Sequence, residues 1–340
     1  MSSASLLTLD PNNAASQLFR QVIEGQGAEA HHLMDDLIAA DWTLERIVVD
    51  LLVVVQQQIG ELWQAGRRTI CDEHVATAVV DDLLGALGRR VGSPNSQGTV
   101  ALVCAEGEWH VTPPRMAALL LRDRGWRTIL LGGSTPADHL ARNLEVTPPT
   151  FLAVSCTDAR FLLGAARVAG IARSLGIPTI AGGRAFGSSA HRAHRLGFDG
   201  WAPTVAEGSQ ILDGWMEVAP APEPPTEVVD VGQWGSERSW TGIADQAIQR
   251  LTSVSPPVLH HRAQPLEEVR QDLVDLLRLA HLADMCDDPS VFTDFVAWRS
   301  AIEFSHGIPS VAVRPTIEVL GDLTASLGGR TQAILRSSVS

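Results

Sequence analysis

Residues 100–124 read VALVCAEGEWHVTPPRMAALLLRDR and set the pattern for the middle of the chain. The apolar run over 100–104 is typical of a buried strand, and a polar loop separates it from a helical segment over 114–124. The alternation continues with expected strands and helices over 128–131, 136–144, 151–155, 161–175, 178–181, 200–202 and 205–216. This spacing predicts a doubly wound α/β domain over 98–217 with a five-stranded parallel sheet.

The residues before this domain have a helical pattern. Apolar side chains recur at close to the 3.6-residue period from 12 to 91, and the connections between segments are short. A long third helix is expected to start after Asp41 or Thr43. The fourth helix is expected to be capped by Thr69 or Asp72. We therefore predict an antiparallel four-helix bundle over 12–91.

The residues after the α/β domain begin with a linker. Residues 218–228 read VAPAPEPPTEV, which is rich in proline and acidic side chains, and we place the linker over 218–234. Apolar stripes at helical spacing follow, so a helical domain is expected over 235–335. The predicted fold class is α/β plus all-α, with a bundle, a sheet domain and a C-terminal helical domain.

Composition excludes several functions. Lys and Arg number 26 against 39 Asp and Glu, the net charge is −13, and every one of the 26 cations is Arg. Without lysine the chain has no Schiff-base enzyme chemistry and no P-loop. Without tyrosine it has no Tyr acid or nucleophile. The acidic balance makes nucleic acid a poor partner.

Cysteine use and hydropathy bear on location. The four cysteines form no CxxC pair, which disfavours a disulfide scaffold or a Cys-rich zinc site and favours a reducing cytoplasm. No apolar run approaches the roughly 20 residues that a membrane span needs. The N-terminus lacks the basic region of a signal peptide. We expect a cytoplasmic protein with no membrane part.

The loop after the first strand carries the most specific chemistry. Glu108 and His110 are two residues apart, so the carboxylate can accept a hydrogen bond from one imidazole nitrogen. The other nitrogen would then be a more basic metal ligand. An exposed histidine beside an acid is the simpler alternative. Ligation is favoured because Ser155, Thr157 and the pair Gly182-Gly183 follow later strands and would lie at the same edge of the sheet.

These segments resemble the cobalamin-binding module, which carries Asp/Glu-x-His-x-x-Gly, then Ser-x-Thr/Leu, then Gly-Gly. The matching segments are Glu108-Trp109-His110-Val-Thr-Pro113, Ser155-Cys-Thr157 and Gly182-Gly183. The resemblance implies a flavodoxin- or Rossmann-like domain in which His110 ligates cobalt from below. It also implies that the displaced dimethylbenzimidazole lies beside Ser155 and the glycines. Pro113 replaces the last glycine of the motif, so the resemblance does not define the backbone path of this loop, although the histidine still matches.

A second pattern lies in the bundle, where nine residues separate Trp63 from Glu73-His74. The simpler alternative is that these residues have structural roles only: a tryptophan packed in the bundle, a glutamate that caps a helix, and a histidine on the surface. The pattern also resembles the signature of cobalamin photoreceptors of the CarH type. That resemblance implies that Trp63 and Glu73 contact the adenosyl group of adenosylcobalamin. It further implies that His74 becomes the upper cobalt ligand after light removes this group.

The resemblance also bears on how the protein would transmit a light signal. CarH-type repressors carry an N-terminal DNA-binding domain, whereas only about ten residues precede the bundle here. We therefore expect no direct DNA binding. The expected output is a homo-oligomer whose state depends on light, or binding of a downstream effector protein, without enzymatic turnover.

The C-terminal helical domain resembles that of photocobilins, which pair a cobalamin module with a bilin-binding domain. This implies biliverdin as a second chromophore. The candidate bilin contacts are Arg278, His281, Trp298, His306 and Arg314. His281 is preferred because it lies beside an apolar stripe, while His306 fits a helix C-cap equally well. Cys286 could form a thioether or be a bystander.

Three alternatives remain at this point. The first is a corrinoid methyl carrier that serves a methyltransferase, in which Trp63 and His74 would obstruct the upper face. The second is a cobalamin mutase, which is disfavoured because no region has room for a barrel of about 250 residues. The third is a scaffold in which these motifs are unrelated.

Overall fold

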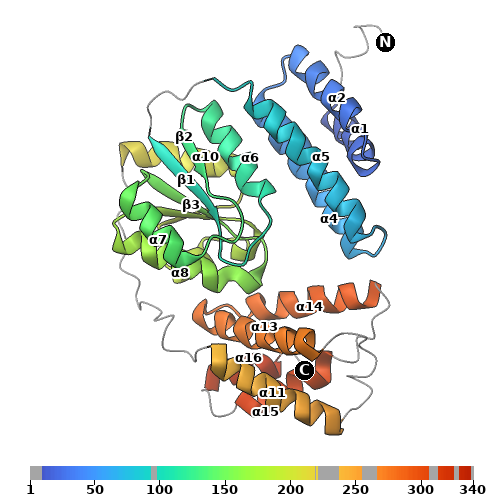
Figure 1. The fold of residues 1–340 in the computed structure, drawn as a ribbon, viewed down its shortest axis with the longest axis vertical. Helices are drawn as coiled ribbons and strands as arrows, with labels where there is room; N and C mark the ends of the chain where they lie inside the picture. Colours follow the sequence, from blue (N-terminus) through green and yellow to red (C-terminus); the bar gives the residue numbers. More distant parts are fainter. Residues whose placement is uncertain are drawn as a thin grey trace.

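The computed structural model contains a helical bundle, a parallel sheet with helices on both faces, and a second helical region (Figure 1). This arrangement confirms the predicted fold class. The residues that the structure describes are 10–92, 98–218, 220, 237–254, 266–305, 313–324 and 329–337. Within these ranges, no helix combines the length and the apolar character needed to cross a bilayer.

The bundle is built around one apolar core. Its elements are α1 (Pro11–Ile23), α2 (Gly27–Ala39), α3 (Leu44–Arg46), the π-helical η2 (Ile47–Val53), α4 (Val54–Gln64) and α5 (Ile70–Gly88). Thr69 begins α5, because its Oγ1 accepts a hydrogen bond from the backbone N–H of Asp72 at 3.2 Å. The Asp72 carboxylate accepts in return from the backbone N–H of Thr69 at 2.8 Å. This reciprocal capping box fixes where the helix starts.

The third helical segment differs from the regular helix that the sequence predicts. It starts after Thr43, which caps it, but Ile47–Val53 is π-helical. Two adjacent pairs are buried in this stretch, Ile47 with Val48 and Leu51 with Leu52. These four side chains lie on one face of the segment, and α4 resumes the α-helical repeat at Val54.

The sheet is fully parallel, with strand order β2-β1-β3-β4-β5. The strands are β1 (Thr99–Cys104), β2 (Arg127–Leu130), β3 (Phe151–Ser155), β4 (Thr179–Gly182) and β5 (Gly200–Ala202). The elements between them are α6 (Thr112–Asp123), α7 (Ala137–Val146), η3 (Ala159–Phe161), α8 (Leu162–Ser174), η4 (Arg184–Phe186), α9 (His191–Arg195) and α10 (Val205–Glu217). Helices α6 and α10 cover one face, and α7 and α8 cover the other (Figure 1).

Helix α6 begins earlier than predicted, at Thr112 rather than Pro114. Pro113 and Pro114 both lie in its first turn, where backbone N–H groups have no partner within the helix. The missing N–H of proline therefore costs nothing there. Pro113 is thus accommodated as the second residue of α6.

Helix α6 also joins the bundle to the sheet. Leu119 and Met116 are part of the bundle core. Thr112 Oγ1 donates to the Asp81 carboxylate at 3.1 Å, and Arg115 Nη1 lies 3.0 Å from the same group. The C-terminal half of α5 is thus fixed against the sheet domain.

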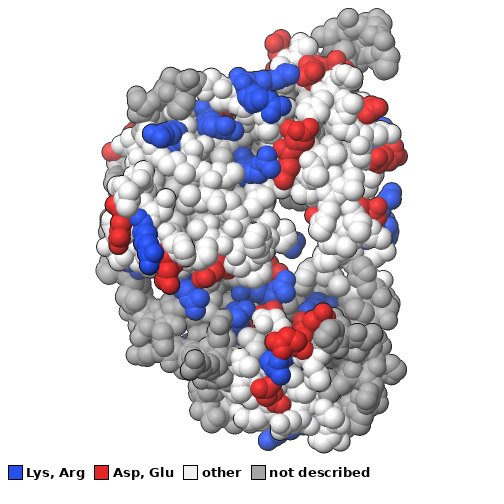
Figure 2. Space-filling model, viewed as in Figure 1, with Lys and Arg blue, Asp and Glu red and all other residues white. Residues whose placement is uncertain are grey.

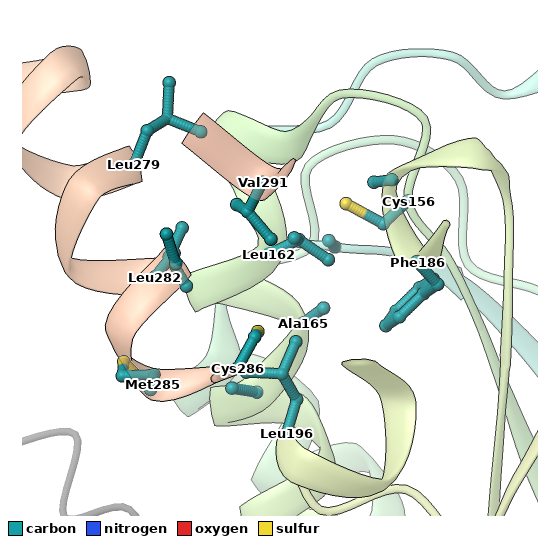
Figure 3. Close-up of a cluster of buried hydrophobic side chains, with 14 of the residues drawn as sticks. Cys156, Leu162, Ala165, Phe186, Leu196, Leu279, Leu282, Met285, Cys286 and Val291 are labelled. Carbon is teal, nitrogen blue, oxygen red and sulfur yellow. The ribbon is translucent and has the colours of Figure 1, made fainter. Parts of the chain in front are cut away.

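The C-terminal helical region packs on the sheet domain through a shared core. Its helices are α11 (Glu237–Val254), α13 (Leu266–Met285), α14 (Ser290–Ser305), α15 (Val313–Leu323) and α16 (Gly329–Ser337). Figure 3 shows Leu282, Cys286 and Val291 of this region directed toward the helices of the sheet domain. Leu162 and Leu196 meet them from the other side.

Candidate functional site

Small side chains end four neighbouring strands at one edge of the sheet. Cys104 of β1 pairs with Ser155 of β3. Ser155 pairs in turn with Gly182 of β4, which pairs with Ala202 of β5. Side chains alternate along a strand, so all four lie on the face that α6 and α10 cover. A Cβ added to Gly182 would meet no atom within 4 Å, so the sheet has an open slot beside Ser155 and Gly182.

Gly183 has a different role from its neighbour. Its φ is +103°, and a Cβ there would lie 2.2 Å from the carbonyl oxygen of Cys156. Only glycine fits this backbone. The close approach holds the loop after β4 against the loop after β3, which carries Thr157.

Glu108 is fully buried and joins two of these loops. Its Oε1 accepts from the backbone N–H of His110 at 3.0 Å and from His110 Nδ1 at 2.5 Å. Its Oε2 accepts from the backbone N–H groups of Thr157 at 2.7 Å and Asp158 at 3.0 Å. Burial alone would raise the pKa of Glu108, but the hydrogen bonds from His110 and Asp158 outweigh it and hold the pKa at about 2. The group is therefore a carboxylate at neutral pH.

This carboxylate orients His110. Because Nδ1 donates to Glu108, Nε2 on the other side of the ring is available to a ligand. The hydrogen bond raises the pKa of His110, while partial burial acts in the opposite direction. The side chain is 56 % exposed, so a metal can reach it. A carboxylate–histidine pair of this kind orients a metal-binding imidazole and makes it more basic.

Trp63, Glu73 and His74 lie together at one end of the bundle. Trp63 is in the last turn of α4, and Glu73 and His74 are in the first two turns of α5. Thr77 Oγ1 donates to Glu73 Oε1 at 3.0 Å, and His74 Nε2 lies 3.6 Å from Glu73 Oε2. The His74 side chain is 72 % exposed.

The molecule is hollowed between the bundle and the sheet domain. Figure 2 shows this hollow beside the part of the bundle where Figure 1 places the N-terminal half of α5. The loop from β1 to α6, which carries His110, lies on the side of the sheet domain that faces α4 and α5 (Figure 1). The sheet domain and the bundle thus form the two walls of this hollow.

The candidate bilin contacts divide into two groups. Arg278 and His281 share Trp240 of α11: the Arg278 guanidinium lies 5.9 Å from the Trp240 ring centroid, and the His281 ring lies 6.0 Å from it. Trp298 instead contacts Trp63, with ring centroids 6.5 Å apart. His306 and the side chain of Arg314 lie outside the described residues.

Sequence inspection missed contributions that the main chain makes. Thr157 was predicted for its hydroxyl, but its contact with Glu108 is through the backbone N–H, as is that of Asp158. Ser134 was also missed; its N–H donates to the Glu108 carbonyl oxygen at 2.7 Å, and its Oγ accepts from the N–H of Gly107 at 3.1 Å. The Gly-Gly-Ser segment after β2 was the available signal, because it lies at the same edge of the sheet.

Comparison with known proteins finds similarity to cobalamin-binding proteins in both the bundle and the sheet domain. Two family models, each described as a B12 binding domain, match residues 14–87 and 98–208. The first match covers the bundle and the second covers the sheet domain. These matches support cobalamin binding and confirm the predicted resemblance to the cobalamin-binding module.

Individual relatives are more distant. The HTH-type transcriptional repressor CarH of Myxococcus xanthus is 30% identical over 128 residues, which are 38% of this chain and 42% of that protein. The monomethylamine corrinoid protein of Methanosarcina barkeri has a TM-score of 0.52 at 17% identity and matches 62% of this chain and 100% of that one. The methanol:cobalamin methyltransferase complex of the same organism has a TM-score of 0.35 at 18% identity, with 65% of this chain and 85% of that one covered.

Proposed function

We propose that this protein is a light sensor that binds adenosylcobalamin between the bundle and the sheet domain. The observation that carries the proposal is the buried Glu108 carboxylate, which holds His110 with Nε2 available at the carboxyl end of the sheet. The partial similarity to the repressor CarH supports light sensing in particular.

The residues on the sheet side fit the lower half of this cofactor. His110 would hold cobalt through Nε2, and Glu108 would keep the ring in place. We place the nucleotide tail in the slot beside Ser155 and Gly182, where nothing lies within 4 Å of the Cβ position of Gly182. Gly183 keeps the backbone at the slot entrance in the conformation that the loop needs.

The residues on the bundle side fit the upper half. When bound, the cofactor supplies a cobalt–carbon bond that visible light breaks. Trp63 offers an aromatic face for the adenine, and Glu73 is held by Thr77 so that its second oxygen can accept from a ribose hydroxyl. His74 is exposed and would take the upper position once the adenosyl group has left. The bundle would then shift relative to the sheet, which is a two-state element biased by a ligand.

The shift of the bundle would be the output of the sensor. We infer that it changes self-association or exposes a surface to an effector protein, with no reaction catalysed and no direct contact with DNA. The acidic net charge of −13 supports a protein partner over a nucleic acid.

Illumination of the reconstituted protein tests the proposal. Protein loaded in the dark with adenosylcobalamin is expected to show a histidine-ligated, base-off spectrum. Green light is expected to convert this spectrum irreversibly and to change the elution volume in size-exclusion chromatography. His74→Ala should bind the cofactor in the dark but lose the change in elution volume. His139→Ala, which removes an exposed histidine on α7, is the control and should respond like the wild type.

A corrinoid methyl carrier is the alternative function, and similarity in fold to a monomethylamine corrinoid protein supports it equally. A carrier would bind methylcobalamin and exchange the methyl group with a partner enzyme, with no light-dependent change in elution volume. A wild type that binds no cobalamin would contradict both functions.

Biliverdin is the second chromophore in the proposal. We place it at the cluster of Arg278, His281 and Trp240, where a cation and two rings lie together. Both rings are buried and Arg278 Nη1 pairs with Asp275 at 2.7 Å, so the bilin would displace these contacts. Attachment through Cys286 is disfavoured, because this thiol is fully buried in the core shared with the sheet domain and burial raises its pKa to about 12.

Addition of biliverdin to the dark protein is expected to give a red-absorbing band that co-elutes with the chain. His281→Ala should weaken this band, and His191→Ala, at an exposed position on α9, should not. A band of equal strength in both variants would contradict the role of His281, and no band in the wild type would remove biliverdin from the proposal.

A further inference from the structure

Helix α14 contacts both walls of the hollow. At its first residue, Ser290 Oγ accepts from Arg192 Nη2 at 2.7 Å, and Asp288 just before it lies 2.7 Å from Arg192 Nε. Arg192 belongs to α9 of the sheet domain and is buried. Val291 enters the core shared with the sheet domain (Figure 3). The start of α14 is therefore fixed to the sheet domain.

The middle of α14 lies close to the loop that holds Glu108. The Arg160 guanidinium is 5.9 Å from the ring centroid of Phe295 on α14. Arg160 Nη2 also donates to the Asp158 carboxylate at 2.6 Å. Asp158 is the residue whose backbone N–H donates to Glu108. Three consecutive contacts thus connect α14 with the carboxylate that orients His110.

The end of α14 contacts the bundle. Phe295 and Trp298 have ring centroids 5.5 Å apart, and Trp298 and Trp63 follow at 6.5 Å with their planes at 44°. Ser305 Oγ donates to the carbonyl oxygen of Gln64 at 2.7 Å. A Cβ on Gly66 would lie 2.7 Å from the Ser305 carbonyl oxygen, so the approach is as close as the backbone permits. With 16 residues, α14 spans about 24 Å from one wall to the other.

We propose that Trp298 is part of the cobalamin site, where it forms with Trp63 the aromatic surface that receives the nucleoside on the upper side of the metal. The inference rests on the proposed function, because Trp63 is the predicted adenosyl contact. Both rings are only half-buried in this structure, so each keeps surface for a ligand. Stacking of a base on an aromatic side chain contributes about 1–3 kcal/mol. Trp298 therefore acts in cobalamin binding rather than in bilin binding, and α14 completes the site.

Affinity for two forms of the cofactor tests this role. Adenosylcobalamin and methylcobalamin both carry a carbon ligand on the upper side of cobalt, but only adenosylcobalamin has the nucleoside. The ratio of their affinities in the dark therefore isolates the contact with the nucleoside. Trp298→Ala is expected to lower this ratio about tenfold, which corresponds to about 1.4 kcal/mol, and Trp298→Phe should retain most of it. Arg299→Ala is the matched control, because it breaks the pair between Arg299 Nη2 and Asp272 at 2.6 Å and loosens the same helix. Its ratio should equal that of the wild type.

A second measurement uses the protein without cofactor. Trp63→Ala, Trp298→Ala and the double variant form a thermodynamic cycle. The shift in melting temperature of the double variant should be smaller than the sum of the shifts of the two single variants. Additive shifts would overturn the direct contact. A ratio of affinities that falls in Trp63→Ala but not in Trp298→Ala would overturn the inference and leave the proposed function standing. A wild type loaded with adenosylcobalamin whose spectrum and elution volume do not respond to light would instead remove the proposed function itself.

Discussion

Replacement of Glu108 by alanine is expected to lower the melting temperature of the cofactor-free protein by roughly 6–12 °C. The carboxylate accepts four hydrogen bonds, three of them from backbone N–H groups, and is fully buried. The Glu108→Ala variant leaves these donors without an acceptor, and each buried donor left unpaired costs about 1–3 kcal/mol. The same change should reduce cobalamin affinity by roughly tenfold to a hundredfold, because His110 loses the group that orients it.

Glu106 provides the control for this prediction, since it lies in the same loop. Its side chain is partly exposed and pairs with Arg167 Nη1 at 3.5 Å. A surface pair of this kind contributes at most about 1 kcal/mol, so Glu106→Ala should melt within about 4 °C of the wild type. Thermal melts followed by circular dichroism and cofactor titrations measure both quantities. Equal melting temperatures for the two variants would show that the buried carboxylate does not join the loops.

Gly182→Val is expected to have the opposite profile, with binding lost and the fold retained. The added side chain meets no atom at its Cβ, Gly182 has no positive φ, and valine is favoured in strands. Its two methyl groups would occupy the slot beside Ser155. Forcing extra carbon atoms into filled space costs about 1–3 kcal/mol, so cobalamin affinity should fall roughly tenfold to a hundredfold.

Cobinamide makes this experiment specific, because it keeps the corrin ring and cobalt but lacks the nucleotide tail. Gly182→Val should bind cobinamide as the wild type does. An equal loss for cobinamide and cobalamin would mean that the slot does not hold the tail. Gly183→Ala is the matched comparison: its Cβ would clash with the carbonyl oxygen of Cys156 at 2.2 Å, so this variant should lose stability and the affinity for both ligands.

The sequence was sufficient for features that depend on local pattern. Apolar runs and helical periods predicted the alternation that forms the parallel sheet, because each element shows its own period. The pair Glu108 and His110 could be recognised because two residues at that spacing can meet in a loop without help from the rest of the chain. The strand-end positions of Ser155 and Gly182 followed from the rule that parallel strands end at a common edge.

Features that depend on tertiary contacts could not be predicted in this way. Asp158 acts through its backbone N–H, a group that every residue but proline carries. The contact of Trp298 with Trp63 joins residues far apart in the chain, so no spacing reveals it, and Trp298 was therefore assigned to the bilin. The π-helical stretch at Ile47–Val53 has no counterpart in the apolar pattern, because its buried residues also fit the spacing of a regular α-helix.

The bridge formed by α14 has a consequence for how the protein behaves at different concentrations. Its contacts with the sheet domain, through Arg192, and with the bundle, through Trp63, all lie within one chain. Groups tethered in one chain meet at an effective concentration in the millimolar range, set by the tether rather than by the sample. Dilution therefore leaves the position of α14 unchanged, whereas the fraction of associated copies of the chain falls as the protein concentration falls.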